Sequence, residues 1–237
     1  MADQTTAGSI RARVRAEMID EIKTVARRHI AQEGAALSLR AVARELGMVS
    51  SALYRYFPSR DELLTALIID AYDSMGEAAE AADAAIPDRT DVLARWVAVA
   101  HALRDWAVAQ PHLYGLIYGS PVPGYAAPED TIGPATRPVV VLGAIMADAK
   151  AAGRLDLETG AAPAIPAALR VEIDRVAEAV TMDVPAAVAA RGLIGWTELF
   201  GAISFELFGR FNNTIDERRD WFDHQVRVMG AFVGLRG

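Results

Sequence analysis

Helical periodicity runs through almost the whole chain, and this feature most restricts what it can fold into. Over residues 15–33, apolar residues recur three or four positions apart at Ile19, Ile22, Ala26 and Ile30, so they share one helical face. Comparable spacing predicts helices over 15–33, 39–46, 50–57, 59–85, 91–109, 111–118, 138–152, 166–181, 185–211 and 216–235. Strand signals are nearly absent, since VVVL at 139–142 falls within a longer helical pattern. The chain is therefore predicted to be all-α.

Prolines divide this helical pattern. They stand at or before the first turns of predicted helices at Pro87, Pro111, Pro166 and Pro185. The segment 119–138 contains five prolines and three glycines. A loop of that length is uncommon inside a compact domain and is typical of a lid, a binding segment or a disordered stretch. Both an ordered lid and a disordered loop stay open here.

The composition restricts the classes of protein to consider. The chain has 237 residues, of which 52% are apolar and 23% charged, as in soluble globular proteins. It contains no cysteine, which excludes disulfides, thiolate metal sites and cysteine nucleophiles. The N-terminus lacks the apolar core of a signal peptide, and the most apolar run, 188–211, carries four charged residues. A cytoplasmic protein without a membrane partner is expected.

Charge is distributed unevenly along the chain. Residues 1–60 hold ten Arg or Lys against six Asp or Glu, whereas residues 61–237 hold fourteen against twenty-five. The net charge of −7 thus conceals a basic N-terminal part and an acidic remainder. Such asymmetry indicates a basic module attached to an acidic body, although chance clustering would give the same counts.

The stretch LGMVSSALYRYFPSRDELL at 46–64 predicts a helix-turn-helix. Two short helices meet across Gly47, which can adopt the positive φ that a tight turn needs. Leu46, Leu53 and Phe57 are spaced to face inward. Ser59 and Glu62 form a capping box that starts the next helix.

The other side chains of this stretch are suited to DNA. Ser50, Ser51, Tyr54 and Arg55 project outward from the second short helix, where a major groove would lie. Hydroxyls and phenols can bind phosphate, and arginine can pair with guanine through two hydrogen bonds. Arg60 adds a cation at the N-terminus of the next helix, a position that favours anions.

At this point the sequence resembles the tetracycline-repressor (TetR) family of bacterial transcription regulators. The resemblance covers about residues 16–67 and rests chiefly on LYRYFPSRDELL from Leu53, preceded by Ser38, Val42-Ala43 and Leu46-Gly47. It implies DNA contacts at Ser38, Arg40, Ser50, Ser51, Tyr54, Arg55, Tyr56 and Arg60. His29 departs from the pattern, because the family usually has an apolar core residue there.

The resemblance also implies an architecture and partners. A three-helix DNA-binding domain at 1–60 would precede a larger helical domain at 61–237 for effector binding and dimerisation. The implied partners are a double-stranded DNA operator, a small-molecule effector of unknown identity and a second copy of the chain. The segment from Trp106 to Tyr125 resembles a subset of these regulators, with Gln110 where histidine is expected, and does not identify the effector.

An enzyme is the main competing hypothesis. The four histidines, His29, His101, His112 and His224, have no metal-ligand spacing, and no catalytic motif occurs. We therefore expect no catalytic residue, metal or cofactor, and only His112 is placed to touch a ligand. A helical small-molecule-binding protein, or an enzyme with a vestigial DNA-binding module, remains the alternative.

Apolar and aromatic residues of the larger domain suggest an effector pocket between helices. Trp96, Ala100, Leu103 and Ala107 form a helical stripe that fits either plain core or a pocket wall. The predicted ligand-binding residues are Trp96, Leu103, Trp106, Tyr114, Tyr118, Tyr125, Met146 and Phe200, with Tyr125 as a lid.

The last two predicted helices have the composition of a dimer interface. The helix at 185–211 is apolar nearly all round, which requires burial on more than one side. The predicted interface residues are Gly195, Leu199, Ala202, Gly209, Trp221, Phe222, Val226 and Met229. A single deep core in a monomer is the alternative. The sequence as a whole predicts a homodimeric repressor that a small apolar ligand releases from its operator.

Overall fold

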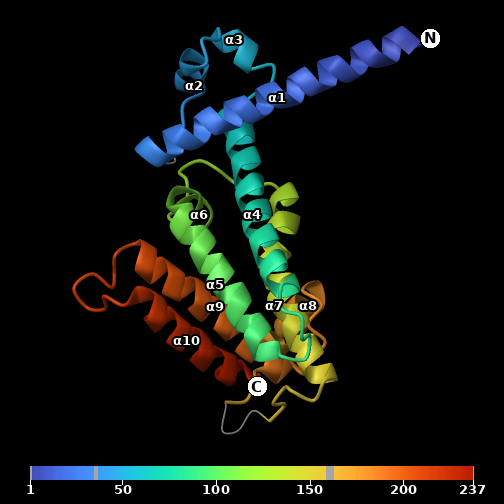
Figure 1. Cartoon of the computed structure of the whole chain (residues 1–237), viewed down its shortest axis with the longest axis vertical. Helices are drawn as coiled ribbons and strands as arrows, with labels where there is room; N and C mark the ends of the chain where they lie inside the picture. Colours follow the sequence, from blue (N-terminus) through green and yellow to red (C-terminus); the bar gives the residue numbers. More distant parts are fainter. Residues whose placement is uncertain (1, 35–36, 159–162, 237) are drawn as a thin grey trace. The chain divides into compact units, whose positions relative to one another are not determined.

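The structure, a computed structural model, describes residues 2–34, 37–158 and 163–236. Within these residues the regular secondary structure is helical, and no strand occurs (Figure 1). The elements are α1 (Ala2–Glu33), α2 (Leu39–Glu45), α3 (Ser50–Leu53), α4 (Arg60–Ala84), α5 (Val92–Ala109), α6 (Pro111–Tyr118), the 3-10 turn η1 (Glu129–Thr131), α7 (Ile132–Ala151), α8 (Ala167–Ala179), α9 (Ala186–Leu207) and α10 (Arg218–Val233). The all-α prediction is confirmed.

The chain divides into two compact units. The N-terminal unit comprises Met1–Ala71 and His112–Thr131, and the C-terminal unit comprises Tyr72–Pro111 and Ile132–Gly237. Helix α4 contributes its first part to one unit and its second part to the other. The N-terminal unit therefore contains a segment, 112–131, that lies far from the helix-turn-helix in sequence.

The N-terminal unit is built around one face of α1. Its buried side chains recur at the helical spacing seen in the sequence, and α2, α3 and the first half of α4 supply the rest of the core. The buried apolar residues include Ile22, Val25, Ala26, Ile30, Leu39, Val42, Leu53, Phe57, Leu63, Leu64 and Leu67. Helix α1 begins well before the predicted residue 15, because alanines and arginines upstream are good helix formers.

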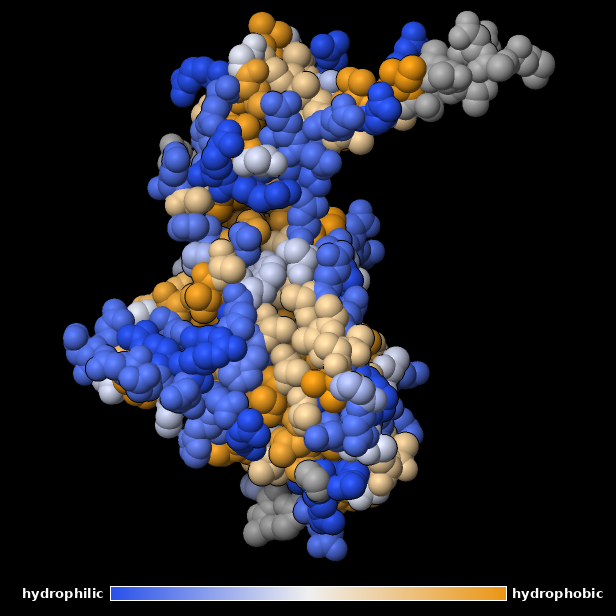
Figure 2. All heavy atoms as spheres, in the orientation of Figure 1, coloured by the Kyte–Doolittle hydropathy of each residue, from blue (hydrophilic) through white to orange (hydrophobic). Residues whose placement is uncertain are grey.

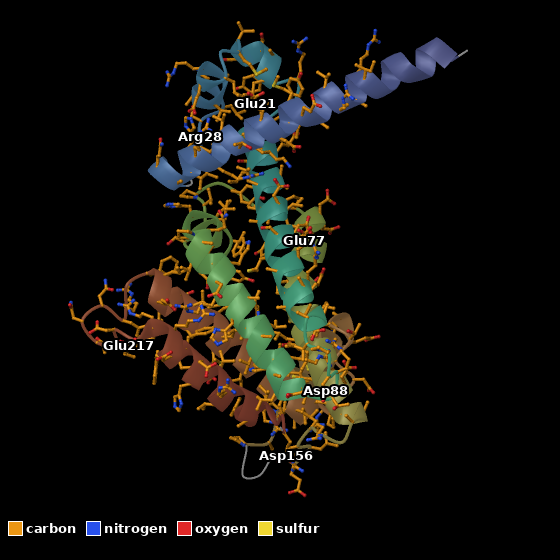
Figure 3. The ribbon with its side chains drawn as sticks, viewed as in Figure 1. Glu21, Arg28, Glu77, Asp88, Asp156 and Glu217 are labelled. Atoms are coloured by element: carbon orange, nitrogen blue, oxygen red, sulfur yellow. The ribbon has the colours of Figure 1, made fainter. Side chains whose placement is uncertain are left out.

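Ion pairs join α1 to α2 at His29, where the resemblance implies an apolar core residue. The ring nitrogen Nε2 of His29 lies 2.6 Å from Glu45 Oε2, and Arg28 donates to the other carboxylate oxygen at 2.7 Å. Arg28 extends from α1 beside α2 in Figure 3. The hydrogen bonds from Arg28 and then His29 hold the pKa of Glu45 below its usual value. A histidine is accepted at this half-buried position because a carboxylate on the facing helix binds it.

The first half of α4 is fixed to α1 by a second carboxylate. Lys23 Nζ and Arg27 Nη2 each donate to Asp70 at 3.0 Å, one to each oxygen. Half-buried pairs of this kind, with two donors on one acceptor, hold geometry better than single exposed pairs. The first half of α4 is therefore fixed to α1, the longest helix of the N-terminal unit.

The proline-rich segment is ordered over its second half, contrary to one of the two expectations. The turn η1 and helix α7 begin at Glu129 and Ile132, so the loop is shorter than the predicted 119–138. Pro134 lies in the first turn of α7, where a missing N–H costs nothing, and Pro138 is tolerated within the helix. Tyr125 Oη lies 2.9 Å from Thr65 Oγ1, which ties the remaining loop to α4 within the N-terminal unit.

The C-terminal unit is a bundle in which α5 and α9 are central. Helix α5 contacts α7, α9 and α10, while α9 contacts α5, α7, α8 and α10. Figure 1 shows α9 and α10 side by side. Its buried residues include Trp96, Val99, Leu103, Leu142, Ile145, Met146, Leu199, Ile203, Phe222 and Val226.

Two buried arginines of this bundle, Arg95 and Arg104, have carboxylate partners. The guanidinium of Arg95, almost fully buried, donates to Asp83 at 2.7 Å and to Asp148 at 2.8 Å. Arg104 is also buried and donates through Nε to Glu206 on α9 at 2.8 Å. Removing one member of such a pair leaves an uncompensated charge, so these pairs fix which helices are neighbours.

Two stretches, Glu129–Ala151 and Ala186–Leu207, are long and apolar enough to cross a membrane by length and composition alone. Both pack against other helices of the C-terminal unit. Arg137, in the first stretch, donates to Glu80 and Asp73 of α4 at 2.9 and 2.7 Å. Their apolar character therefore has an explanation in the packing of the bundle.

Candidate nucleic-acid interface and effector-domain residues

The turn between α2 and α3 is closed by backbone hydrogen bonds. Met48 N donates to Ala43 O at 2.8 Å, and Gly47 N donates to Arg44 O at 3.1 Å. This is the Schellman pattern, in which the residue after the helix adopts the left-handed conformation. Gly47 has a φ of 66°, so the glycine is needed for its conformation, as the sequence predicted.

The second helix of the motif is shorter than predicted. We expected a helix over 50–57, whereas α3 ends at Leu53 and the chain continues in turns to Tyr56. Tyr56 N donates to Leu53 O at 2.8 Å, three residues back, so the last turn is tighter than an α-helix. Leu53 O also accepts from Phe57 N at 3.1 Å, so these turns remain partly α-helical, and Pro58, which has no N–H, does not continue them.

The inward and outward sides of this segment follow the predicted pattern. Leu53 is fully buried and Phe57 nearly so, whereas Arg55 is exposed and Tyr54 is 42% exposed. Ser51 is also exposed, and Ser50, at the start of α3, is half-buried. The hydroxyls, the phenol and the guanidinium expected to meet DNA are therefore on the accessible side.

The remaining predicted contacts lie at helix starts. Ser38 caps α2, since its Oγ accepts from Ala41 N at 3.3 Å, and Arg40 is exposed in the first turn. Ser59 Oγ accepts from Glu62 N at 3.1 Å, which confirms the predicted cap of α4. Arg60 is the first residue of α4 and lies 3.6 Å from Asp61, with a third of its side chain exposed.

Two residues of this surface escaped the sequence reasoning. Arg15 of α1 places its guanidinium carbon 5.1 Å from the centre of the Tyr56 ring and donates to Arg55 O at 3.3 Å. Val49, which precedes α3, is 70% exposed beside the predicted contacts. Arg15 was missed because it lies forty residues from Arg55 in the sequence. Val49 was missed because an apolar residue is not expected among DNA contacts.

The predicted ligand residues of the C-terminal unit are largely core. Trp96 is buried, and its indole N–H donates to Val226 O of α10 at 3.1 Å. Leu103 and Met146 are buried as well, while Phe200 packs edge-on against Trp196 with ring centres 6.1 Å apart. Trp106 is half-buried and donates to Ser74 Oγ of α4 at 3.0 Å. Trp106 therefore keeps an accessible edge, which Trp96 lacks.

The three predicted ligand tyrosines belong to the N-terminal unit. Tyr114 and Tyr118 stack one helical turn apart on α6, with ring centres 5.2 Å apart. Tyr114 is buried, Tyr118 is half-buried, and Tyr125 is bound to Thr65. His112, the histidine singled out in the sequence, is exposed at the start of α6.

Most predicted interface residues are already buried within the chain. Leu199, Phe222, Val226 and Met229 pack between α9, α10 and α5, and Ala202 is nearly buried. A Cβ on Gly195 would lie 2.7 Å from Val233 Cγ1, so this glycine admits α10 of the same chain. The other predicted interface residues are Gly209, which has a φ of 71° after α9, and Trp221, which is half-buried.

Three of the predicted interface residues, Ala202, Trp221 and Met229, also line a hollow beside exposed apolar side chains, which we call the α9–α10 groove. Its hollow of about 520 Å³ is lined by Glu198, Gly201, Ala202, Phe205, Phe211, Trp221, His224, Gln225, Val228 and Met229. Phe205 and Val228 are more than half exposed. Among the residues that the structure describes, the indole N–H of Trp221 and the amide oxygen of Gln225 have no partner despite being buried.

Two of the four histidines are held by carboxylates. His29 and His101 are bound by the carboxylates of Glu45 and Asp223, at 2.6 and 3.0 Å. Over the described ranges, no three His, Cys, Asp or Glu side chains are grouped to hold a metal ion. These histidines have structural partners.

Comparisons with known proteins agree with this geometry. Residues 22–67 match the bacterial regulatory proteins of the tetR family, and residues 96–229 match the tetracyclin repressor-like C-terminal domain. The HTH-type transcriptional regulators Mb1846 of Mycobacterium bovis and Rv1816 of Mycobacterium tuberculosis are each 38% identical over 97% of this chain and 98% of their own length. The crystal structure of the regulatory protein SCO4313 is 36% identical, covers 92% of this chain and 97% of its own, and superposes with a TM-score of 0.73. The chain is a DNA-binding transcriptional regulator that belongs to the TetR family.

Proposed function

We propose that this regulator is a homodimeric repressor that a small, largely apolar ligand releases from a DNA operator. The observation that carries the proposal is the outward surface of the helix-turn-helix. Exposed Ser51, Tyr54 and Arg55 stand over a buried base formed by Leu53 and Phe57. A rigid base with exposed donors is what reading a major groove requires.

The predicted contacts differ in kind, which allows a direct test. Tyr54 and Arg60 are assigned to phosphates, so Tyr54→Phe and Arg60→Ala should weaken binding to all operator variants alike. Arg40, Ser50, Ser51 and Arg55 are assigned to base choice, so Arg55→Ala should cost roughly 1–3 kcal/mol at one base pair only. Ser38 and Tyr56 are proposed as two further DNA contacts.

The measurement is a binding titration on a panel of duplexes chosen by the wild-type protein from a randomised pool. Arg175→Ala, which removes an exposed arginine from the C-terminal unit, is the matched control. It should bind like the wild type. A change of base preference in Arg60→Ala would contradict its assignment to phosphate.

The dimer is proposed to form through the α9–α10 groove. Its exposed aromatic and aliphatic residues make an apolar surface that a second copy could bury, with two helices from each chain. Gly201 at the groove has open space above its Cα, so a partner helix can approach closely.

Val228→Arg tests the groove without disturbing the core, because this side chain is more than half exposed in the single chain. We expect a folded monomer in sedimentation velocity, with weakened operator binding. Val171→Arg, on an exposed position of α8, is the control and should remain dimeric. A wild-type protein that stays monomeric at micromolar concentration would remove the proposal.

The effector is proposed to bind in the C-terminal unit beside Trp106, the half-buried tryptophan among the predicted ligand residues. A ligand that prefers the form unable to bind DNA needs only about 1–3 kcal/mol of coupling to change affinity 5- to 150-fold. Tryptophan fluorescence and operator binding should be titrated with the same panel of small aromatic and apolar compounds. Trp106→Phe identifies the signal of this residue. A compound that quenches Trp106 at saturation and leaves operator affinity unchanged would refute the coupling for that compound.

A further inference from the structure

A stretch in the first half of α1 carries a group of arginines that are not among the predicted DNA contacts. Residues 10–16 read IRARVRA, with three arginines and no acidic residue. Every one of these side chains is exposed. In Figure 2, hydrophilic and hydrophobic residues lie next to each other along the exposed part of α1.

Two of the three arginines share a face. Arg11 and Arg15 are four residues apart, so they are neighbours on the helix surface and about 6 Å apart along its axis. Arg13 lies on the opposite side and pairs with Glu17, whose carboxylate is 3.6 Å from its Nε. The face with Arg11 and Arg15 therefore bears positive charge that Glu17 does not neutralise.

Arg15 connects this face to the recognition segment. Its guanidinium lies over the Tyr56 ring, and one of its N–H groups donates to the carbonyl of Arg55. A guanidinium has five N–H donors, so stacking and one hydrogen bond leave others for a phosphate. The contact also places Arg15 beside the residues that are proposed to meet DNA.

An exposed helical stretch with this composition has little within the chain to stabilise it. Isolated helical turns are marginal in water, and the like charges of Arg11 and Arg15, four residues apart on one face, repel each other. A polyanion on the side of Arg11 and Arg15 would relieve both problems. Duplex DNA presents phosphates at regular spacing on either side of the groove that a recognition helix enters.

We propose that Arg11 and Arg15 bind backbone phosphates next to the base pairs read by α3, so that α1 extends the DNA site beyond the helix-turn-helix. This inference rests on the proposed function. Arg11 supplies affinity from flanking DNA and no base choice, whereas Arg15 joins that contact to the position of Tyr56 and Arg55.

The test uses the full chain and two probes. One probe is a duplex selected by the wild-type protein from a randomised pool, and the other is the same duplex trimmed to its sequence-specific bases. Arg11→Ala should lose several-fold in affinity on the long duplex, and its dependence on salt should decrease by about one unit of slope. On the trimmed duplex it should bind like the wild type. Arg11→Lys, which keeps the charge, should restore most of the affinity on the long probe.

Arg13→Ala is the matched control, because it removes the same charge from the opposite face of the same turns. It should leave binding to both probes close to that of the wild type. An equal loss in Arg13→Ala and Arg11→Ala would overturn the inference, since charge in general would then explain the effect. Wild-type affinity in Arg11→Ala on the long duplex would overturn it as well. A wild-type protein that selects no sequence would instead refute the proposed function itself.

Discussion

The two units differ in whether their aromatic and arginine side chains named below are exposed or buried. In the N-terminal unit, Tyr54 and Arg55 are exposed, and the short helices beneath them are held by caps and backbone bonds. In the C-terminal unit, Trp96 and Arg95 are almost fully buried and their polar atoms are bound within the chain. Tyr54 and Arg55 are thus available to a partner, while Trp96 and Arg95 maintain the bundle.

The contrast teaches that residue type alone does not reveal a binding site. Tryptophan and arginine are frequent at binding surfaces, yet here their buried examples are bound by Val226 and by Asp83 and Asp148. Substitutions should therefore affect mainly DNA binding in one unit and mainly the free energy of unfolding in the other.

The largest effect is expected for Trp96→Ala. The substitution removes a buried indole and its hydrogen bond to Val226 O, and should lower the free energy of unfolding by about 3–5 kcal/mol. Urea denaturation followed by circular dichroism measures it. A loss below about 1 kcal/mol would contradict the contrast between the two units, because Trp96 would then line a cavity instead of filling the core.

Gly195→Ala should come next. A Cβ at this position would meet Val233 Cγ1 at 2.7 Å, so α9 and α10 must separate, which costs about 1–3 kcal/mol. Gly133→Ala in α7 is the control, because nothing lies within 4 Å of its added Cβ. Both variants should be compared by thermal unfolding at equal concentration. Equal midpoints of thermal unfolding would contradict this prediction, because α10 would then accommodate a methyl group at residue 195 without cost.

Gly47→Ala should cost about 1–2 kcal/mol, because its positive φ is strained for a residue with a Cβ even where space is open. Gly47→Asn should be tolerated better, since asparagine adopts this conformation more readily. The measurement pairs unfolding with DNA binding. An alanine variant as stable as the wild type would show that the turn can relax.

The smallest effect concerns pH. Burial would raise the pKa of Asp83, but hydrogen bonds from Arg95 and Arg89 outweigh it and hold this pKa below the ordinary 3.8. The stabilisation is present above the ordinary value and is lost as pH falls through the lower, folded-state value. Unfolding measured between neutral pH and acid should thus show a shallower acid loss for Asp83→Asn, by about 1 kcal/mol. Identical acid profiles would contradict this assignment.

The sequence predicted the N-terminal unit in more detail than the C-terminal one. Gly47 and the Ser59 cap were correct because turn and cap chemistry is local and acts through few residues. The end of α3 at Leu53, four residues before the predicted end, was missed. Arg15 could not be found, because contact between residues forty positions apart depends on how α1 crosses the motif.

In the C-terminal unit, periodicity located the helices but did not show which neighbouring helix each apolar face contacts. A stripe such as Trp96 and Leu103 fits core and pocket equally well until α10 is placed beside it. Gly195 was predicted to admit a partner chain, and the neighbour that the structure shows is Val233 of the same chain. Such choices depend on tertiary packing, which one sequence does not encode locally.

The closure of the α2–α3 turn has a consequence for substitutions beside it. The two bonds that set the angle between these helices join backbone atoms, from Met48 to Ala43 and from Gly47 to Arg44. Only Gly47 is required by its conformation, so Val49, Ser50 and Ser51 can mutate while the helices keep their arrangement. Substitutions at these three positions should therefore change the chemistry that the start of α3 exposes while the turn keeps its fold.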